Sequence, residues 1–216
     1  MKWMHALAGK FLVFDGPDGS GKSTQTEKFV ALCRTVGLDV LEVREPGGTA
    51  IGEQIRAVLL SPENEEMSLR CEMMLYMASR AQLIEEKIRP ALRAGKLVLA
   101  DRFISSTLAY QGTAGGIPLD EIIACGRVAI GDHWPDLTVI FDVDASTAAK
   151  RLNPLLDRME LKGEAFHHKV REGFLSQAKA DPQHYLIVDA RATPEQVFGD
   201  LIDGLRERLE RLPPAI

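Results

Sequence analysis

The chain of 216 residues has the length of one domain with its own hydrophobic core. Hydrophobic residues make up 45% and charged residues 26%, and a net charge of −5 argues against a dedicated nucleic-acid surface. No apolar run approaches a membrane span, and the first ten residues lack the apolar core of a signal peptide. The cysteines Cys33, Cys71 and Cys125 fit no disulfide framework and are expected to be small core residues. We expect a cytoplasmic protein without nucleic-acid or membrane partners.

The first motif of the chain is a glycine-rich stretch that follows a short apolar run. Residues 10–14 (KFLVF) are typical of a buried strand, and residues 22–36 carry apolar side chains at helical spacing. Between them, residues 16–23 (GPDGSGKS) match the pattern G-x-x-x-x-G-K-[ST]. Such a loop turns its backbone N–H groups toward phosphate oxygens, and the helix that follows directs its positive end at the same anion. The alternative is a strand–helix turn that is rich in glycine but binds nothing.

This stretch predicts the phosphate-binding loop (P-loop) of an ATP site. Lys22 is expected to reach the β- and γ-phosphates, and Ser23 to join the shell of a Mg²⁺ ion. Phosphate binding does not explain Asp18, because an acid in such a loop is unfavourable without a metal, a sugar hydroxyl or a cation beside it. The predicted ATP-binding residues are Gly16, Pro17, Asp18, Gly19, Ser20, Gly21, Lys22, Ser23 and Thr24.

Strand-like runs recur along the chain at residues 39–43, 96–100, 137–143 and 185–188. They are rich in Val, Ile and Leu without clean alternation, as in strands that are buried on both faces. Helical patterns separate them; the longest covers residues 66–92, with Met73, Met74 and Met77 available for packing and Pro90 expected to kink the last turn. This alternation predicts an α/β domain over residues 1–216, a P-loop NTPase-type five-stranded parallel sheet covered by helices on both faces.

Polar motifs follow the predicted strands, where ligands bind in sheets of this kind. The second strand runs into REPGGT at residues 44–49, and the third into DRF at 101–103 and SSTLAYQG at 105–112. Asp101 holds the position of the Walker-B acid and is predicted, with Ser23, to hold Mg²⁺. Arg102 is predicted to clamp a phosphate, since its planar fork matches phosphate oxygens. An Asp–Arg pair that only caps a strand end is the alternative.

The motifs FDGPDGSGKST, REPGGT, DRF followed by SSTLAYQG, and WPDLTVIFDVDA resemble the bacterial thymidylate kinases in order and spacing. EMMLYMASRAQ, LDRME and FHHKVREGFL agree, so the resemblance extends from about residue 10 to 209. Many families share the P-loop, whereas REPGGT and AYQG are much more specific. The resemblance implies an enzyme that phosphorylates dTMP to dTDP with ATP and Mg²⁺ and so supplies dTTP for DNA synthesis. It also implies a homodimer through the long helices.

The resemblance further implies which residues surround the sugar and phosphate of dTMP. Asp18 would reach the sugar, whose free 3′-hydroxyl can donate a hydrogen bond to it. Arg56 and Arg102 would hold the phosphate, with Glu45 beside them. Without the motifs, Arg56 would be read as part of a solvated helix face.

For the base, the resemblance implies that Tyr76 stacks on thymine and that Arg80 and Gln111 bond its edge, with Thr107 close by. Each position has a simpler interpretation without the motifs. Arg80 could belong to a solvated helix face, Tyr76 to the core, and Gln111 to a turn cap.

The sequence departs from the family in two places. Ser105 stands where the family commonly has an acid, which puts a metal or sugar role there in doubt. A mobile lid is expected at about residues 150–162, and this segment has fewer arginines than in many relatives. Because Gly19 stands where some relatives place an arginine in the P-loop, the catalytic cation is expected from the lid. Arg158 of LDRME is the first choice and Arg151 the second, acting with Lys22 and Arg102.

Two other functions fit the P-loop alone. One is a kinase that acts on another nucleotide or on a nucleoside, such as dCMP. The base-facing set described above favours thymine, and a screen of acceptors would decide. The other is a nucleotide-dependent switch that signals through a partner, although the chain lacks the N-K-x-D guanine signature. Turnover without any partner protein would separate the switch from the kinase.

Overall fold

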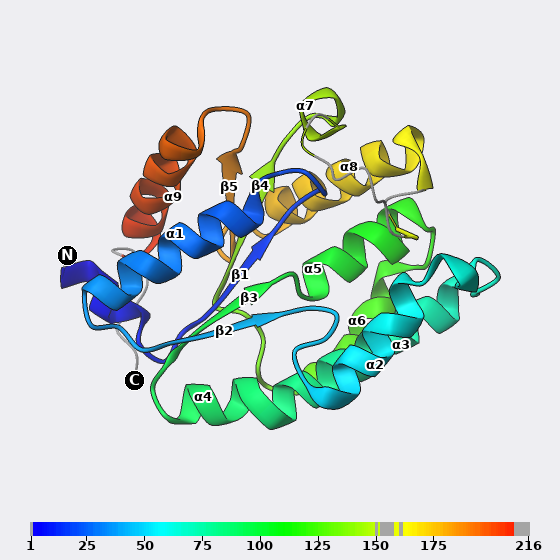
Figure 1. Ribbon diagram of the computed structural model, residues 1–216, viewed down its shortest axis with the longest axis horizontal. Coiled ribbons are helices and arrows are strands. Elements are labelled where there is room, and N and C mark those ends of the chain that lie inside the picture. Colours follow the sequence, from blue (N-terminus) through cyan, green and yellow to red (C-terminus); the bar gives the residue numbers. More distant parts are fainter. Residues whose placement is uncertain (1, 150, 152–157, 160–161, 210–216) are drawn as a thin grey trace.

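A computed structural model describes residues 2–149, 151, 158–159 and 162–209 (Figure 1). It contains a five-stranded sheet in the order β2-β3-β1-β4-β5, in which every pairing is parallel. The strands are β1 Phe11–Asp15, β2 Val40–Arg44, β3 Leu97–Asp101, β4 Leu137–Asp142 and β5 Tyr185–Asp189. All five predicted strands are therefore confirmed, and so is the α/β fold with a parallel sheet.

The register of the sheet brings the polar motifs to one edge. Phe14 of β1 and Arg44 of β2 both pair with Asp101 of β3, while Asp15 pairs with Ile140 of β4. Because parallel strands end at the same edge, the P-loop, REPGGT and DRF all leave the sheet side by side (Figure 1).

Successive residues of β1 point to opposite faces of the sheet and enter two separate cores. Leu12 and Phe14 pack on the face that η1 Lys2–Leu7, α1 Lys22–Thr35 and α9 Pro194–Leu209 cover. Phe11 and Val13 pack on the other face, against the helices of residues 69–130. That second group comprises α3 Leu69–Leu83, η3 Ile84–Ile88, α4 Arg89–Arg93, α5 Ile104–Thr107, η4 Leu108–Ala114 and α6 Leu119–Ile130. Burial on both faces explains why the strands lack polar alternation.

The remaining elements are α2 Ala50–Leu60, η2 Pro62–Asn64, α7 Ala145–Ala149 and α8 Glu164–Ala180. Helix α2 packs beside α3, whereas α8 packs against η4 and the strands β4 and β5. A third small cluster, which includes Tyr110 and Phe174, joins η4 to α8. None of the helices in the described part of the chain is long and apolar enough to cross a membrane.

The predicted helix over residues 66–92 is continuous but not uniform. It runs as α3, widens into the π-helical η3, and resumes as α4, where Pro90 lies in the first turn and its missing N–H is tolerated. Two of the packing expectations were wrong: Met74 is 54% exposed, and Cys71 is exposed as well. Both lie on the side of α3 that faces away from the sheet, since three residues nearly complete a helical turn. Cys33 is buried as expected, and Cys125 is half-buried.

Candidate active site

A cavity of about 680 Å³ opens at the carboxyl edge of the sheet. It has two ends, which different parts of the chain line. The P-loop end is lined by residues 19–25, Arg151, Ala190, Ala192, Pro194 and Val197. The α3 end is lined by Glu45, Arg56, Tyr76, Arg80, Thr107 and Gln111. A cavity of this volume suits a small-molecule site, and it brings together P-loop residues and all of the residues implied to surround the base.

Two glycines of the P-loop lie where the neighbouring backbone leaves no room for a side chain. A Cβ atom at Gly16 would lie 2.5 Å from the carbonyl oxygen of Phe141, and one at Gly19 would lie 2.5 Å from that of Ala148. Both glycines also have positive φ angles, 139° and 74°. The loop curls around Lys22, whose Nζ donates to the carbonyl oxygens of Gly16 and Pro17 at 3.1 Å each. Burial lowers the pKa of Lys22, and Arg102 adds to this shift.

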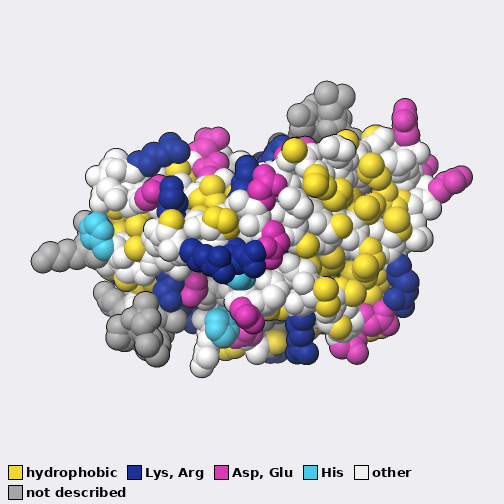
Figure 2. Space-filling view, turned by 90° about the horizontal axis from the view of Figure 1, so that it is seen from below, with side chains coloured by type: hydrophobic (Ala, Val, Ile, Leu, Met, Phe, Trp, Pro, Cys, Tyr) yellow, Lys and Arg dark blue, Asp and Glu magenta, His cyan; other side chains and the backbone are white. Residues whose placement is uncertain are grey.

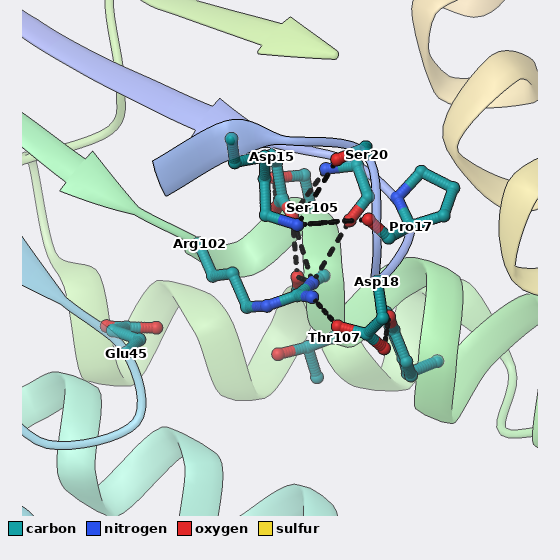
Figure 3. A network of polar contacts seen from close by, with 12 residues as sticks. Asp15, Pro17, Asp18, Ser20, Glu45, Arg102, Ser105 and Thr107 are labelled. Atoms are coloured by element: carbon teal, nitrogen blue, oxygen red, sulfur yellow. Dashed lines mark hydrogen bonds and ion pairs between the residues drawn. The ribbon is translucent and has the colours of Figure 1, made fainter. Parts of the chain in front are cut away.

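Arg102 lies between the P-loop and Glu45, and its guanidinium points at the loop (Figure 3). Its Nη1 donates to Ser106 Oγ at 3.0 Å and to the Gly16 carbonyl oxygen at 3.2 Å, while Nη2 donates to Asp18 Oδ1. Burial disfavours the ionised form of Asp18, but Arg102 and Lys22 outweigh it, so the pKa of Asp18 is lowered. The acid that phosphate binding left unexplained therefore faces two cations.

Arg80 is buried rather than on a solvated helix face, with 1% of its surface exposed. Its Nε and Nη2 donate to Glu45 Oε2 at 2.9 and 2.6 Å, and Nη2 also donates to Thr107 Oγ1 at 3.1 Å. Burial raises the pKa of Glu45 to about 7, although Arg80 pulls in the opposite direction. This pair ties the end of β2 to α3 and holds Arg80 at the wall of the cavity.

Gln111 lies in the same wall, 2% exposed, and its Nε2 donates to Glu72 Oε1 at 2.7 Å. Tyr76 is half-buried, one helical turn from Glu72 on α3, and lines the cavity. Arg56 of α2 is half-buried too, and its Nη1 donates to the carbonyl oxygen of Pro46 at 2.9 Å. One end of the cavity is thus surrounded by the ring of Tyr76, the guanidinium of Arg80, the amide of Gln111 and the cationic Arg56. This set of groups suits a nucleobase with an anionic group attached.

Comparison with known proteins decides the family. The family model described as thymidylate kinase matches residues 14–201. The chain belongs to the thymidylate kinase family. A thymidylate kinase from Pseudomonas fluorescens is 45% identical over 207 residues, which cover 95% of this chain and 99% of that protein. One from Geobacillus sp. is 41% identical over 208 residues, with 94% and 99% covered. The crystal structure of thymidylate kinase from Ehrlichia chaffeensis superimposes with a TM-score of 0.77 at 30% identity, covering 92% of this chain and 99% of that one.

Membership of the thymidylate kinase family confirms the resemblance, and with it the P-loop NTPase fold and a kinase activity. The expected lid, about residues 150–162, lies largely outside the described residues, which include only 151, 158, 159 and 162 of it. Arg151 lines the P-loop end of the cavity and donates through Nη1 to the Ala190 carbonyl oxygen at 2.9 Å. Arg158 is buried instead, with Nε donating to the Leu59 carbonyl oxygen at 2.8 Å and Nη2 2.6 Å from Glu72 Oε2.

The residue at 105, where this sequence departs from the family, has a clear structural place. Ser105 is fully buried, and its Oγ donates to Asp15 Oδ2 at 2.5 Å (Figure 3). Asp15, the last residue of β1, also accepts from Ser106 Oγ at 2.7 Å and from Arg102 Nη1 at 3.4 Å. An acid at 105 would meet the carboxylate of Asp15, whereas a hydroxyl donates to it.

Sequence reasoning missed two residues of this site. Tyr110 lines the cavity and donates through its hydroxyl to Asp18 Oδ2 at 2.6 Å, while its ring lies 5.3 Å from the Arg102 guanidinium carbon. Its place in AYQG was the available signal. Glu72 is 1% exposed and contacts Gln111, Arg158 and Lys162. A lone Glu in a helical pattern normally indicates a solvated face, so the sequence offered no signal for it.

Proposed function

We propose that the chain transfers the γ-phosphoryl group of ATP to the phosphate of dTMP, giving ADP and dTDP. One observation carries this proposal: a single cavity joins a P-loop to a pocket with the polarity of a pyrimidine site. ATP lies along the P-loop end, with its phosphates at residues 16–24. The thymine of dTMP lies at the α3 end, on Tyr76 and against Arg80 and Gln111, with Thr107 beside it.

Arg102 sits where the two substrates meet and is proposed to bind the phosphate of dTMP together with Arg56. Figure 3 shows Arg102 between the P-loop and Glu45, and the phosphates of ATP and dTMP are proposed to face each other beside it. Burial opposes the charge of Arg102, but Asp18 and other acids raise its pKa, which keeps the guanidinium cationic. Asp18 is proposed to accept a hydrogen bond from the sugar of dTMP.

The chemistry needs charge compensation more than a base. The second pKa of a phosphate monoester is about 6, so the attacking phosphate of dTMP is mostly a dianion at neutral pH. The barrier comes from bringing two polyanions in line and from charge that develops on the transferred group. Lys22, Arg102 and the P-loop N–H groups are proposed to serve both tasks. The Lys22 ammonium and the Arg102 guanidinium both lie at the P-loop, where they donate to the Gly16 carbonyl oxygen. Arg158, or else Arg151, is proposed to add a catalytic cation when the lid at about 150–162 closes and excludes water.

The described residues fit a Mg²⁺ ion at the P-loop end. Asp101 Oδ1 is buried and has no hydrogen-bond partner among the described residues, which is unfavourable unless a ligand satisfies it. Ser23, the first-turn hydroxyl of α1, lines the same cavity. No cluster of three His, Cys, Asp or Glu occurs in the described part of the chain. That agrees with Mg²⁺, which keeps several waters and takes one or two protein ligands plus phosphates. Bound there, it would neutralise phosphate charge.

A homodimer is also proposed, through the outer face of α2, α3 and α6. Most of the large exposed hydrophobic residues gather there, and Figure 2 shows hydrophobic side chains concentrated on one half of that view. They are Ile51, Val58, Met74, Leu119, Val128 and Trp134, of which Val128 is 89% exposed. Monomers rarely expose so continuous an apolar surface. The three free cysteines fit a reducing compartment, and we propose that the enzyme is cytoplasmic.

An acceptor screen tests the function directly. ADP release from ATP would be measured with dTMP, dUMP, dCMP, dGMP and thymidine in parallel, without any other protein except the coupling enzymes. We expect dTMP to give the highest kcat/KM. The value for dUMP should be lower only by what the loss of one methyl contact accounts for, and dCMP, dGMP and thymidine should be poor acceptors. Equal use of dCMP and dTMP would contradict the thymine assignment. Turnover that requires an added protein would instead indicate a switch.

A further inference from the structure

Glu72 is a buried acid next to the base pocket that the proposed chemistry does not use. It projects from α3, is 1% exposed, and its two carboxylate oxygens contact three different side chains. Oε1 accepts from Gln111 Nε2 at 2.7 Å, while Oε2 lies 2.6 Å from Arg158 Nη2 and 3.3 Å from Lys162 Nζ. Burying a carboxylate is costly unless it is paired, and here two cations and an amide compensate it.

The contact with Gln111 determines which way its amide faces. An ionised carboxylate can only accept hydrogen bonds, so the –NH₂ group of Gln111 must turn toward Glu72. The reverse orientation would place two oxygens 2.7 Å apart with no proton between them. The amide oxygen Oε1 has no hydrogen-bond donor among the residues that the structure describes. It is therefore available to a ligand in the cavity that Gln111 lines.

We infer that Glu72 is a specificity-determining positioning residue: by holding the Gln111 amide, it presents an acceptor to the base and so selects thymine over cytosine. This inference rests on the proposed function. At N3, thymine carries an N–H donor, whereas cytosine carries an acceptor lone pair. An oxygen fixed at this point of the pocket bonds the first and repels the second. A freely rotating amide would bond either base, so the discrimination comes from Glu72 rather than from Gln111 alone.

The test is the ratio of kcat/KM for dTMP to that for dCMP, in the parent and in Glu72→Gln. A glutamine at 72 can donate as well as accept, so it permits the Gln111 amide to flip. We expect the ratio to fall by about tenfold or more, the size of one exchanged hydrogen bond, with dCMP gaining in absolute terms. Any change in the contact with Arg158 affects both acceptors alike and cancels in the ratio.

Two matched variants separate orientation from general loss of packing. Lys162→Met removes another partner of the same carboxylate but leaves the Gln111 contact, and its ratio should equal that of the parent. The exchange Glu72→Gln with Gln111→Glu restores an acceptor-only group facing the base and keeps the net charge. It should recover the preference for dTMP. The exchange variant keeps one acid in the buried cluster. It therefore still tests the orienting role if Glu72→Gln alone does not fold, as judged by circular dichroism.

The outcomes are distinct. A parent that does not use dTMP would refute the proposed function itself. If the parent prefers dTMP but Glu72→Gln keeps the same ratio while folded, the orienting role of Glu72 is refuted and the function stands. An exchange variant that folds but shows no preference for dTMP would also refute the orienting role of Glu72. The orienting role is supported if the ratio falls in Glu72→Gln, is restored in the exchange variant and keeps the parental value in Lys162→Met.

Discussion

Arg102 combines an unusual backbone conformation with a dense set of side-chain contacts. Its φ angle is 68°, in the left-handed region that residues other than glycine rarely adopt. Such a conformation costs about 1–3 kcal/mol and persists only where the surroundings impose it. Here Asp18, Ser106 and the Gly16 carbonyl oxygen hold the guanidinium. The guanidinium is thus in position before any substrate binds.

Lys22→Ala should abolish most turnover and leave the fold intact. The ammonium group is preorganised at the P-loop, and the loss of one such contact lowers kcat by on the order of a hundredfold or more. Its partners in the structure are mainly backbone carbonyl oxygens, which water can satisfy once the side chain is removed. Steady-state kinetics together with a thermal melt would measure both effects. Near-normal kcat in a folded variant would rule out the P-loop mechanism.

Glu45 should make stability depend on pH in the neutral range. Burial raises its pKa from 4.5 to about 7, so the folded state holds this proton more tightly than the unfolded chain does. The resulting stabilisation is complete below pH 4.5 and is lost as the pH rises through about 7. Relative to Glu45→Gln, the free energy of unfolding of the parent should therefore decrease as the pH rises over this range. Denaturant titrations at several pH values would show it, and parallel curves for the two proteins would contradict it.

At the scale of elements, the two described arginines of the lid region should behave differently. Arg158→Ala is expected to lower kcat with little change in KM for dTMP, the sign of an interaction made mainly in the transition state. Arg151→Ala should chiefly raise KM for ATP, because Arg151 lines the P-loop end of the cavity. Initial rates with each substrate varied in turn separate the two patterns. If Arg158→Ala raised only the KM for dTMP, Arg158 would not be the catalytic cation.

The strands and the P-loop were predictable from sequence because their signals are local. An apolar run followed by a glycine-rich turn and a helix specifies both the conformation and the ligand class within about fifteen residues. The outer face of α3 was not predictable in the same way. Apolar residues such as Met74 fit a packed face as well as an exposed one, and which face meets the sheet is set by tertiary structure.

Within the site, the limit was sequence distance. Gln111 and Glu72 are 39 positions apart, and Arg102 and Asp18 are 84 positions apart. No periodic pattern links such pairs, so the contacts that orient the side chains emerge only from the fold. The family motifs pointed to Tyr76, Arg80, Thr107 and Gln111 of the cavity lining, whereas the hydrogen bonds of Asp15, Tyr110 and Glu72 required the structure.

At the scale of the whole molecule, Val128→Asp should weaken the proposed dimer. Val128 is 89% exposed on α6, amid the apolar surface of α2, α3 and α6. In a two-fold interface the change introduces a charge from each subunit, at a cost on the order of several kcal/mol. Sedimentation velocity would show a shift from dimer to monomer. Ile187→Asp is the matched control, since Ile187 is 47% exposed on β5 and lies outside that surface. A parent that is already monomeric would contradict the dimer.

The pair formed by Glu45 and Arg80 has a consequence for how this enzyme can be engineered. Arg80 is at once a wall of the proposed base pocket and the counter-ion of a buried acid. Replacing it by Met would strand Glu45 without its cation, and breaking a buried pair costs about 3–5 kcal/mol. A redesign that seeks a new base preference should therefore change both positions together, for example Glu45→Gln with Arg80→Met. Selectivity and stability are coupled at this one contact, so a library that varies position 80 alone would discard altered specificities as unfolded proteins.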